Sequence, residues 1–272
     1  MEIKNKVVVV TGAASGIGQA VSIEMARRGA AAVAMVDMTP AIGDIAADIN
    51  KELGHRVARP YQGNVTDDAF RTHVYDELCA QFSVVNVCIP AAGITRDALA
   101  VKVNRATGRA EIYPNEMFRL VTEVDLIAPI YWALELVGRM ANFRLDQGMK
   151  KWDPAEGVQG AIVFIGSVSS QGNKGQIAYA ASKAGLEGAA ATLRKEAIFH
   201  GVRCAVIHPG FTDTPMVRAL GKDYIDKHVL PSTQLGRLIR PTEIADAICF
   251  LVSNSAVSGE LFADAGWHPS AA

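Results

Sequence analysis

The chain is poor in cysteine, and neither sign of charge dominates it. Its 272 residues include 4 Cys without a Cys-x-x-Cys pair, and its 6 His have no zincin spacing. We therefore expect no disulfide framework and no metal site. Lys+Arg number 27 against 28 Asp+Glu, a formal net charge of -1. This balance excludes a broad basic surface for nucleic acid.

Long hydrophobic runs are also missing. The apolar runs fall well short of the about 20 residues that a membrane span requires. No apolar segment of a signal peptide precedes the first β-like run, Val7–Thr11. Hydrophobic residues nevertheless make up 50% of the chain, which predicts a folded globule with a large core. We expect a soluble cytoplasmic protein with no membrane partner.

Short β-branched runs alternate with segments of helical periodicity. This alternation predicts an α/β fold: one doubly wound parallel sheet of the Rossmann type, with about seven strands and helices on both faces. Residues 1–272 are expected to form a single domain whose ligands lie beyond the carboxyl ends of the strands. The expected strands are Val7–Thr11, Ala32–Asp37, Arg56–Tyr61, Val84–Pro90, Ala161–Gly166, Val202–His208 and Gly259–Asp264.

Two polar stretches interrupt the alternation. Asn104–Asn115 and Asn142–Gly157 are interpreted as insertions or loops that form surface excursions, and not as separate domains. Helices are expected from Ala178 to His200 and from Pro241 onward.

A glycine-rich turn follows the first expected strand. Gly12 allows a sharp turn, Gly16 lets a pyrophosphate approach the backbone, and Gly18 permits close packing of helix and strand. The following helix offers its N-terminal N–H groups and the positive end of its dipole to phosphates. The position of this turn between a strand and a helix predicts a dinucleotide site.

Asp37 ends the second expected strand, 19 residues beyond Gly18. An acidic residue near this spacing binds the ribose hydroxyls of NAD. A carboxylate also repels a 2′-phosphate, and no Lys or Arg stands at Ala13, Ala14, Ser15 or Met38 to attract one. The sequence therefore favours NAD over NADP.

Tyr179 and Lys183 lie four residues apart in a helical run, so both project from one face. A nearby ammonium stabilises a phenolate and lowers the phenol pKa. Ser167 follows the apolar strand Ala161–Ile165 and can hold a substrate oxygen. Together these groups suit the interconversion of a carbonyl and an alcohol.

The order Thr11-Gly12-x-x-x-Gly16-x-Gly18, then Ser167, then Tyr179-x-x-x-Lys183 resembles the short-chain dehydrogenase/reductase family over essentially the whole chain. The stretches Gly93–Asp97 and Gly166–Val168 are similar to bacterial 3-oxoacyl-carrier-protein reductases. This resemblance implies a nicotinamide cofactor and a homotetramer.

The resemblance also implies a role for each matching residue. Tyr179 would exchange the proton, Lys183 would bind the nicotinamide ribose, and Ser167 would orient the reacting oxygen. The other implied cofactor-binding residues are Gly12, Ser15, Gly16, Ile17, Gly18, Asp37, Asn64, Val65, Ala92, Gly93, Pro209, Gly210, Thr212 and Thr214.

The chain departs from the family pattern at four places. Asp125 stands where a catalytic Asn is usual, and Pro90 replaces the first Asn of the Asn-Ala-Gly turn. Ser167 and Tyr179 are 12 residues apart instead of the common 13, which leaves Ser169 as an alternative. Asp264-Ala265-Gly266 replaces a common Asp-Gly-Gly.

A segment of about 211–235 corresponds to the mobile lid of the family and contains a mixture of apolar residues. Gln176 and Ile177 are candidate substrate contacts, as are Arg96 and Lys174 for an anionic substrate. Solvated charges are the alternative interpretation for the last two. His208 is interpreted as structural. Trp267, in the C-terminal tail, is a candidate for a subunit interface.

The leading hypothesis is an NAD-dependent short-chain alcohol dehydrogenase or carbonyl reductase that acts on a small secondary alcohol or ketone. Tyr179 would be its general acid and base, and Asp125 is a further catalytic candidate. A dinucleotide-binding sensor or scaffold without turnover is the first alternative, because Asp125 and Pro90 depart from the pattern. An epimerase or dehydratase of the longer family members is the second.

Overall fold

A seven-stranded parallel sheet forms the centre of the protein in the computed structural model, which describes residues 1–266. Its order is β3-β2-β1-β4-β7-β8-β9, so the winding direction reverses between β1 and β4. This confirms the predicted fold class. The strands are β1 (Val7–Thr11), β2 (Ala32–Asp37), β3 (Ala58–Gln62), β4 (Val87–Pro90), β7 (Gly160–Ile165), β8 (Val202–Pro209) and β9 (Gly259–Ala263).

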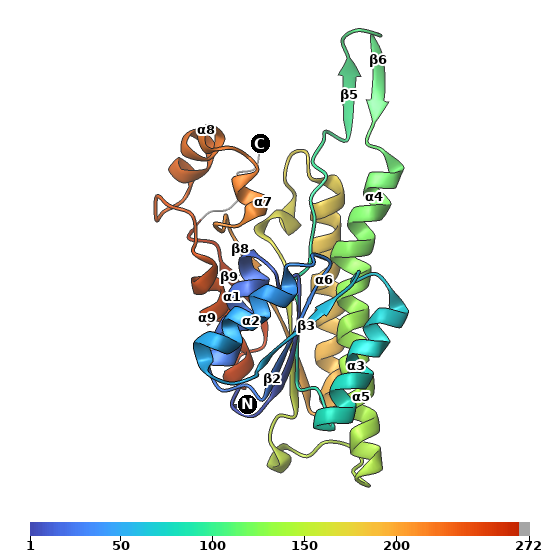
Figure 1. Cartoon of the computed structure of the whole chain (residues 1–272). Helices are drawn as coiled ribbons and strands as arrows, with labels where there is room; N and C mark the ends of the chain where they lie inside the picture. Colours follow the sequence, from blue (N-terminus) through green and yellow to red (C-terminus); the bar gives the residue numbers. More distant parts are fainter. Residues whose placement is uncertain (267–272) are drawn as a thin grey trace.

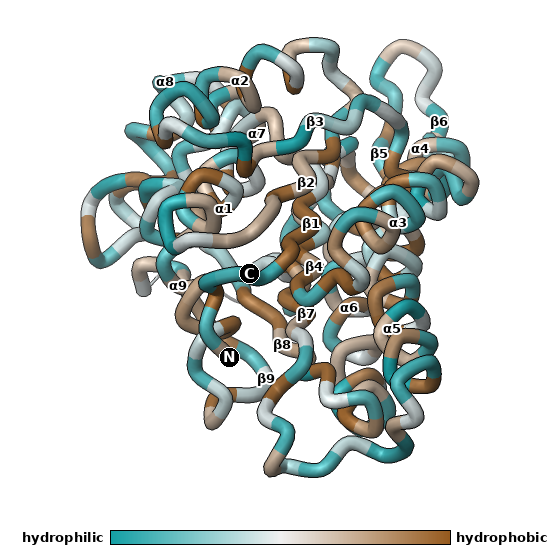
Figure 2. The backbone as a smooth tube through the Cα atoms, turned by 60° about the horizontal axis from the view of Figure 1, so that its bottom comes forward, coloured by the Kyte–Doolittle hydropathy of each residue, from teal (hydrophilic) through white to brown (hydrophobic). Residues whose placement is uncertain are grey.

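Helices cover both faces of the sheet (Figure 1). One layer holds α1 (Gly16–Arg27), α2 (Ile42–Leu53) and α9 (Pro241–Ser253), and the other holds α3 (Asp68–Phe82), α5 (Ala128–Asp146) and α6 (Ile177–Glu196). Strand residues alternate between the layers: Val8 and Val10 pack on the first, Val7 and Val9 on the second. Both faces are buried, which explains the apolar strands in Figure 2.

A π-helical turn, Glu123–Ile127, joins α4 (Asn115–Thr122) to α5 and carries the buried Asp125. Such turns are rare and are frequent at functional sites. Trp132 anchors the next part of α5, because its Nε1 donates to the carbonyl of Val65 at 2.9 Å.

The stretch Asn104–Asn115 is an exposed surface excursion, as predicted, and it contains strand structure that the sequence analysis did not predict. Strands β5 (Val101–Asn104) and β6 (Arg109–Ile112) form an antiparallel hairpin that projects from the body (Figure 1). Alternating apolar and polar residues, with Gly108 in the turn, were the signal for it.

The stretch Asn142–Gly157 is a surface excursion only in its second part. Helix α5 continues to Asp146, and a 3-10 turn at Pro154–Glu156 follows. Arg144, buried on α5, pairs with Glu156 of that turn at 2.5 Å. The ion pair fastens the stretch to the body although its sequence is polar.

The remaining elements agree with the sequence to within a few residues. The expected helix Ala178–His200 is α6 followed by a 3-10 turn at Ala197–His200, and Pro241 opens α9 as predicted. The segment 211–235 contains α7 (Pro215–Arg218), α8 (Lys222–Tyr224), a π turn at Ile225–Val229 and a 3-10 turn at Leu230–Ser232. Trp267 lies outside the described residues. Within residues 1–266, no helix has the length and apolarity that a membrane crossing needs.

Candidate active site

The glycine turn between β1 and α1 combines left-handed backbone angles with contacts too close to leave room for side chains. Gly12 and Gly16 have φ of +64° and +54°. A Cβ on Gly18 would lie 2.2 Å from the carbonyl oxygen of Gly12, and one on Gly16 would lie 2.9 Å from Cγ2 of Thr214. The turn is therefore packed against both the first strand and the segment that follows β8.

A cavity of about 490 Å³ opens at this turn, at the carboxyl ends of the strands where the sheet order reverses. It brings together most of the residues that the sequence predicted for cofactor binding. They are Gly12, Ser15, Gly16, Ile17, Gly18, Asp37, Asn64, Val65, Ala92, Gly93, Tyr179, Lys183 and Thr214.

Asp37 is held in a fixed orientation at the end of this cavity. Its Oδ2 accepts a hydrogen bond from the backbone N–H of Ala14 at 3.0 Å, and its Oδ1 accepts one from Thr39 at 3.1 Å. The carboxylate is therefore positioned by the glycine turn itself. No side chain of opposite charge pairs with it in the described part of the chain.

A second cavity, of about 220 Å³, adjoins the first and shares Tyr179 and Thr214 with it. Ser167 and the predicted residues Pro209, Gly210 and Thr212 line this second cavity. Side chains from the segment 211–235 cover it, namely Phe211, Met216, Val217, Leu220 and Tyr224. The Tyr179 phenol thus stands where the two cavities meet.

Lys183 is buried one helical turn beyond Tyr179. Its Nζ donates to the carbonyl of Ile165 at 3.1 Å and lies 5.4 Å from the centre of the Tyr179 ring. Burial raises the pKa of Tyr179, while the Lys183 ammonium and the Ser167 hydroxyl oppose that rise. The expected lowering by Lys183 is present, but in the protein alone burial outweighs it.

Asp125 lies behind this pair and lines neither cavity. It is fully buried, its Oδ1 accepts from the backbone N–H of Ile94 at 2.8 Å, and its Oδ2 is 3.5 Å from Nζ of Lys183. Burial raises the pKa of Asp125, and both the Lys183 ammonium and the Ile94 N–H counteract this. Lys183 therefore separates the Asp125 carboxylate from the Tyr179 phenol.

Both candidate serines lie at the second cavity, but they face it differently. Ser167 caps the 3-10 turn Val168–Gln171, because its Oγ accepts from the N–H of Ser169 at 3.1 Å. The Ser167 hydroxyl also interacts with the Tyr179 phenol, whereas Ser169 has no such effect on its pKa. This geometry favours Ser167 as the partner of the tyrosine.

The other sequence candidates are divided between the cavities and the surface. Gln176 and Lys174 line the second cavity and Arg96 lines the first, while Ile177 lines neither and is 45% exposed. Sequence reasoning missed Asp97, whose Oδ2 accepts from Nε2 of Gln176 at 2.9 Å across the mouth of the second cavity. Its place directly after the loop that follows β4 was the available signal.

Two departures from the family pattern have clear structural consequences. Pro90 ends β4 opposite Thr11 of β1 and has no N–H for that ladder, and beyond it the N–H of Ala92 donates to Oγ1 of Thr11 at 3.1 Å. Ala265 has φ of +56°, a left-handed conformation that glycine adopts more easily.

The protein has a doubly wound fold with two joined cavities at the edge of the sheet where the strand order reverses, the place where ligands bind in folds of this class. A family model described as "Enoyl-(Acyl carrier protein) reductase" matches residues 12–268. The 3-oxoacyl-(acyl-carrier-protein) reductase FabG of Escherichia coli is 34% identical over 263 residues, which are 96% of each chain. The (3R)-3-hydroxyacyl-CoA dehydrogenase of Canis lupus familiaris is 30% identical, with 93% of this chain and 91% of that one covered.

A solved structure supports the fold. The short-chain type dehydrogenase/reductase from Mycobacterium marinum matches with a TM-score of 0.81 and 23% identity, over 98% of this chain and 96% of that one. The chain belongs to the short-chain dehydrogenase/reductase family, a family of oxidoreductases that bind a nicotinamide cofactor.

Proposed function

We propose that the protein is an NAD-dependent oxidoreductase that interconverts a secondary alcohol and a ketone, with Tyr179 as its general acid and base. The observation that carries this proposal is the position of Tyr179 on both cavities, with buried Lys183 and Ser167 beside it. A sensor without turnover would have no need of this assembly. The test is NADH formation, followed by absorbance, with NAD+ and a panel of alcohols; no turnover despite NAD+ binding would contradict the proposal.

Each group has a distinct task in this mechanism. In the oxidation direction the Tyr179 phenolate takes the hydroxyl proton of the substrate. The Lys183 ammonium, oriented by the Ile165 carbonyl, stabilises that phenolate, and the Ser167 hydroxyl holds the reacting oxygen. The bound nicotinamide would accept the hydride. Asn64, Val65, Ala92 and Gly93 would line the nucleotide, and Pro209, Gly210 and Thr212 would border its nicotinamide end.

The choice of NAD rests on Asp37. Its carboxylate, held by the N–H groups of Ala14 and Thr39, would bind ribose hydroxyls and repel a 2′-phosphate. Asp37→Ala should raise KM for NAD+ by about tenfold or more, since hydrogen bonds to a charged group are lost. Asp44→Ala, an exposed carboxylate on the following helix, is the control. An unchanged KM in Asp37→Ala would refute the assignment.

For the substrate we propose a 3-hydroxyacyl or 3-oxoacyl thioester. The names of the relatives in Escherichia coli and Canis lupus familiaris specify substrates of this class. The apolar residues Met216, Val217 and Leu220 over the second cavity suit an acyl chain. The comparison that tests this is kcat/KM for 3-hydroxyacyl-CoA esters against simple secondary alcohols. Equal kcat/KM values would contradict the thioester as the substrate class and leave the proposed oxidoreductase activity intact.

We further propose a cytoplasmic homotetramer of single-domain subunits, with 211–235 as a lid. The four cysteines are free, as expected in a reducing compartment. Light scattering of the purified protein tests the tetramer. Removal of residues 266–272 tests the proposed place of Trp267 at a subunit interface. An unchanged mass in solution and an unchanged activity would argue against that interface.

A further inference from the structure

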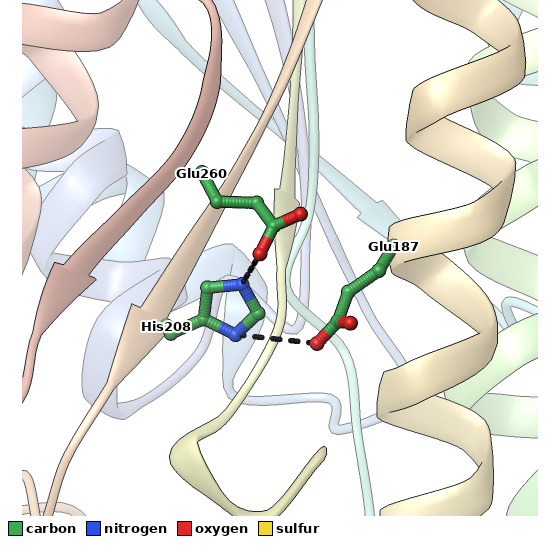
Figure 3. A group of neighbouring side chains, drawn as sticks. All are labelled: Glu187, His208 and Glu260. Atoms are coloured by element: carbon green, nitrogen blue, oxygen red, sulfur yellow. Dashed lines mark ion pairs between the residues drawn. The ribbon is translucent and has the colours of Figure 1, made fainter. Parts of the chain in front are cut away.

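His208 occupies a polar site outside the two cavities, at the end of β8. It is fully buried, and its ring stacks on Phe262 with centroids 4.6 Å apart. Figure 3 shows carboxylates at both ring nitrogens: Glu260 of β9 at Nε2 and Glu187 of α6 at Nδ1. The distances are 3.3 Å and 3.9 Å.

One hydrogen bond indicates that Nδ1 of His208 carries a proton. This nitrogen is 3.2 Å from the backbone carbonyl of Ser167. A carbonyl oxygen only accepts hydrogen bonds, so Nδ1 carries a proton and donates it. The other nitrogen, Nε2, is buried and makes no hydrogen bond within the described chain, although Oε2 of Glu260 is near. With the proton on Nδ1, Nε2 keeps a free lone pair 3.3 Å from a carboxylate oxygen.

The two carboxylates lack any other counter-charge. Among residues 1–266, neither Glu187 nor Glu260 pairs with a lysine or an arginine. Their side chains are 32% and 38% exposed, which gives an ion a path from solvent. A divalent cation would neutralise both charges at once.

The spacing of the ligand atoms suits a small cation. Zn–N and Zn–O bonds of about 2.0–2.2 Å place two ligands of a tetrahedral site roughly 3.3–3.5 Å apart. The Nε2 to Oε2 distance in His208 and Glu260 is 3.3 Å. One ligand atom from each of the three residues lies within 4.8 Å of the others. The Glu187 oxygen lies on the Nδ1 side of the ring, so this partly exposed side chain has to turn toward Nε2 to join the other two ligands.

We propose that His208, Glu260 and Glu187 form a binding site for a divalent cation of the zinc type. Nε2 of His208 and Oε2 of Glu260 are the primary ligands, Glu187 is the third, and water occupies the fourth position. The Nδ1–H bond to the Ser167 carbonyl is the outer contact that metal-binding histidines usually make, and it orients the ring. This site does not depend on the proposed redox function, and the sequence, with its scattered His, did not predict it.

The experiment uses the full-length protein, stripped with EDTA and then dialysed. Zn2+ binding is measured by calorimetry and by elemental analysis, and Co2+ is added as a spectroscopic probe of coordination by nitrogen and oxygen. A Cys79→Ser background removes the one partly exposed thiol. We expect one Zn2+ per chain, a rise in Tm with Zn2+ but not with Mg2+, and a Co2+ absorption band.

Variants separate this site from surface histidines and carboxylates. Glu260→Gln should weaken Zn2+ binding by about tenfold or more, and Glu187→Gln should weaken it less. Glu196→Gln, an exposed carboxylate on the same helix as Glu187, should have no effect. Absence of stoichiometric binding, or binding that neither Glu260→Gln nor Glu187→Gln changes, would overturn the proposal.

Discussion

Lys183 lies between two acidic groups, the Tyr179 phenol and the Asp125 carboxylate. Lys183 and Asp125 are buried, whereas Tyr179 lines both cavities. Charge at any one of them changes the proton affinity of the others. The Asp125 carboxylate raises the pKa of Tyr179 while the Lys183 ammonium lowers it. Replacing the usual Asn with Asp therefore changes the electrostatics of the site without adding a group to the cavity wall.

The first prediction concerns the phenol. Tyr179→Phe should reduce kcat by about 10²–10⁴-fold, because the general acid and base is lost. The dissociation constant for NAD+, measured by fluorescence quenching, should change little and serves as the control for folding. Turnover close to that of the unmodified protein would remove Tyr179 from the mechanism.

The second prediction concerns Asp125. Asp125→Asn removes a negative charge that raises the pKa of Tyr179, so the pKa of the phenol should fall. Oxidation needs the phenolate, and the rising limb of kcat/KM against pH should move to lower pH. Glu116→Gln, an exposed carboxylate on α4, should leave the profile in place. A shift to higher pH would contradict this account.

The third prediction concerns backbone strain. Ala265 adopts φ of +56° where the family commonly has Gly. Ala265→Gly should raise the free energy of unfolding by about 1 kcal/mol, measured by urea denaturation. Ala256→Gly, at an exposed turn without a positive φ, should be neutral or destabilising. Destabilisation by Ala265→Gly would show that the backbone conformation there is not strained.

The helices and strands show what local sequence signals can and cannot provide. Val7–Thr11 and Ala32–Asp37 were predicted with their observed bounds, because uninterrupted apolar runs end at polar or glycine residues. Val84–Pro90 was too long, since only Val87–Pro90 pairs with a neighbour. The end of α5 was missed because Arg144 is buried by an ion pair with Glu156, a contact that no periodicity shows.

The hairpin β5–β6 leads to the fourth prediction. Its ends already meet, because the N–H of Tyr113 donates to the carbonyl of Ala100 at 2.9 Å. Replacing residues 101–112 with Gly-Ser-Gly should change the free energy of unfolding by less than about 1 kcal/mol, because closing a short loop costs little. Chemical denaturation and kcat/KM test this. A large loss of stability would mean that the hairpin packs on another surface.

At the scale of the whole molecule, the reversal of the strand order between β1 and β4 determines where a nucleotide would bind. Turns that are far apart in sequence, after β1, β4 and β8, meet at one edge, and Gly16 touches Thr214 there. The sequence predicted the α/β class from alternation and the cofactor residues from motifs. It could not predict the strand order, or that Asp97 and Gln176 meet across the second cavity, because both depend on contacts distant in sequence.

The fifth prediction follows from that arrangement. NAD+ at a hundred times its dissociation constant should stabilise the fold by about 2.7 kcal/mol, because it binds only the native state. NADP+ at the same concentration should raise Tm less, since the Asp37 carboxylate would repel the extra phosphate. The two nucleotides should become more alike in Asp37→Ala. Equal shifts in the unmodified protein would contradict the preference for NAD.

The turn of the β5–β6 hairpin, Arg105–Gly108, extends beyond the rest of the molecule (Figure 1). The described chain has only one partly exposed thiol, Cys79, so a cysteine placed at Arg105 in a Cys79→Ser protein would be the preferred site for a maleimide. The protein could be tethered there to a bead, or carry a fluorophore, through a residue that does not line either cavity.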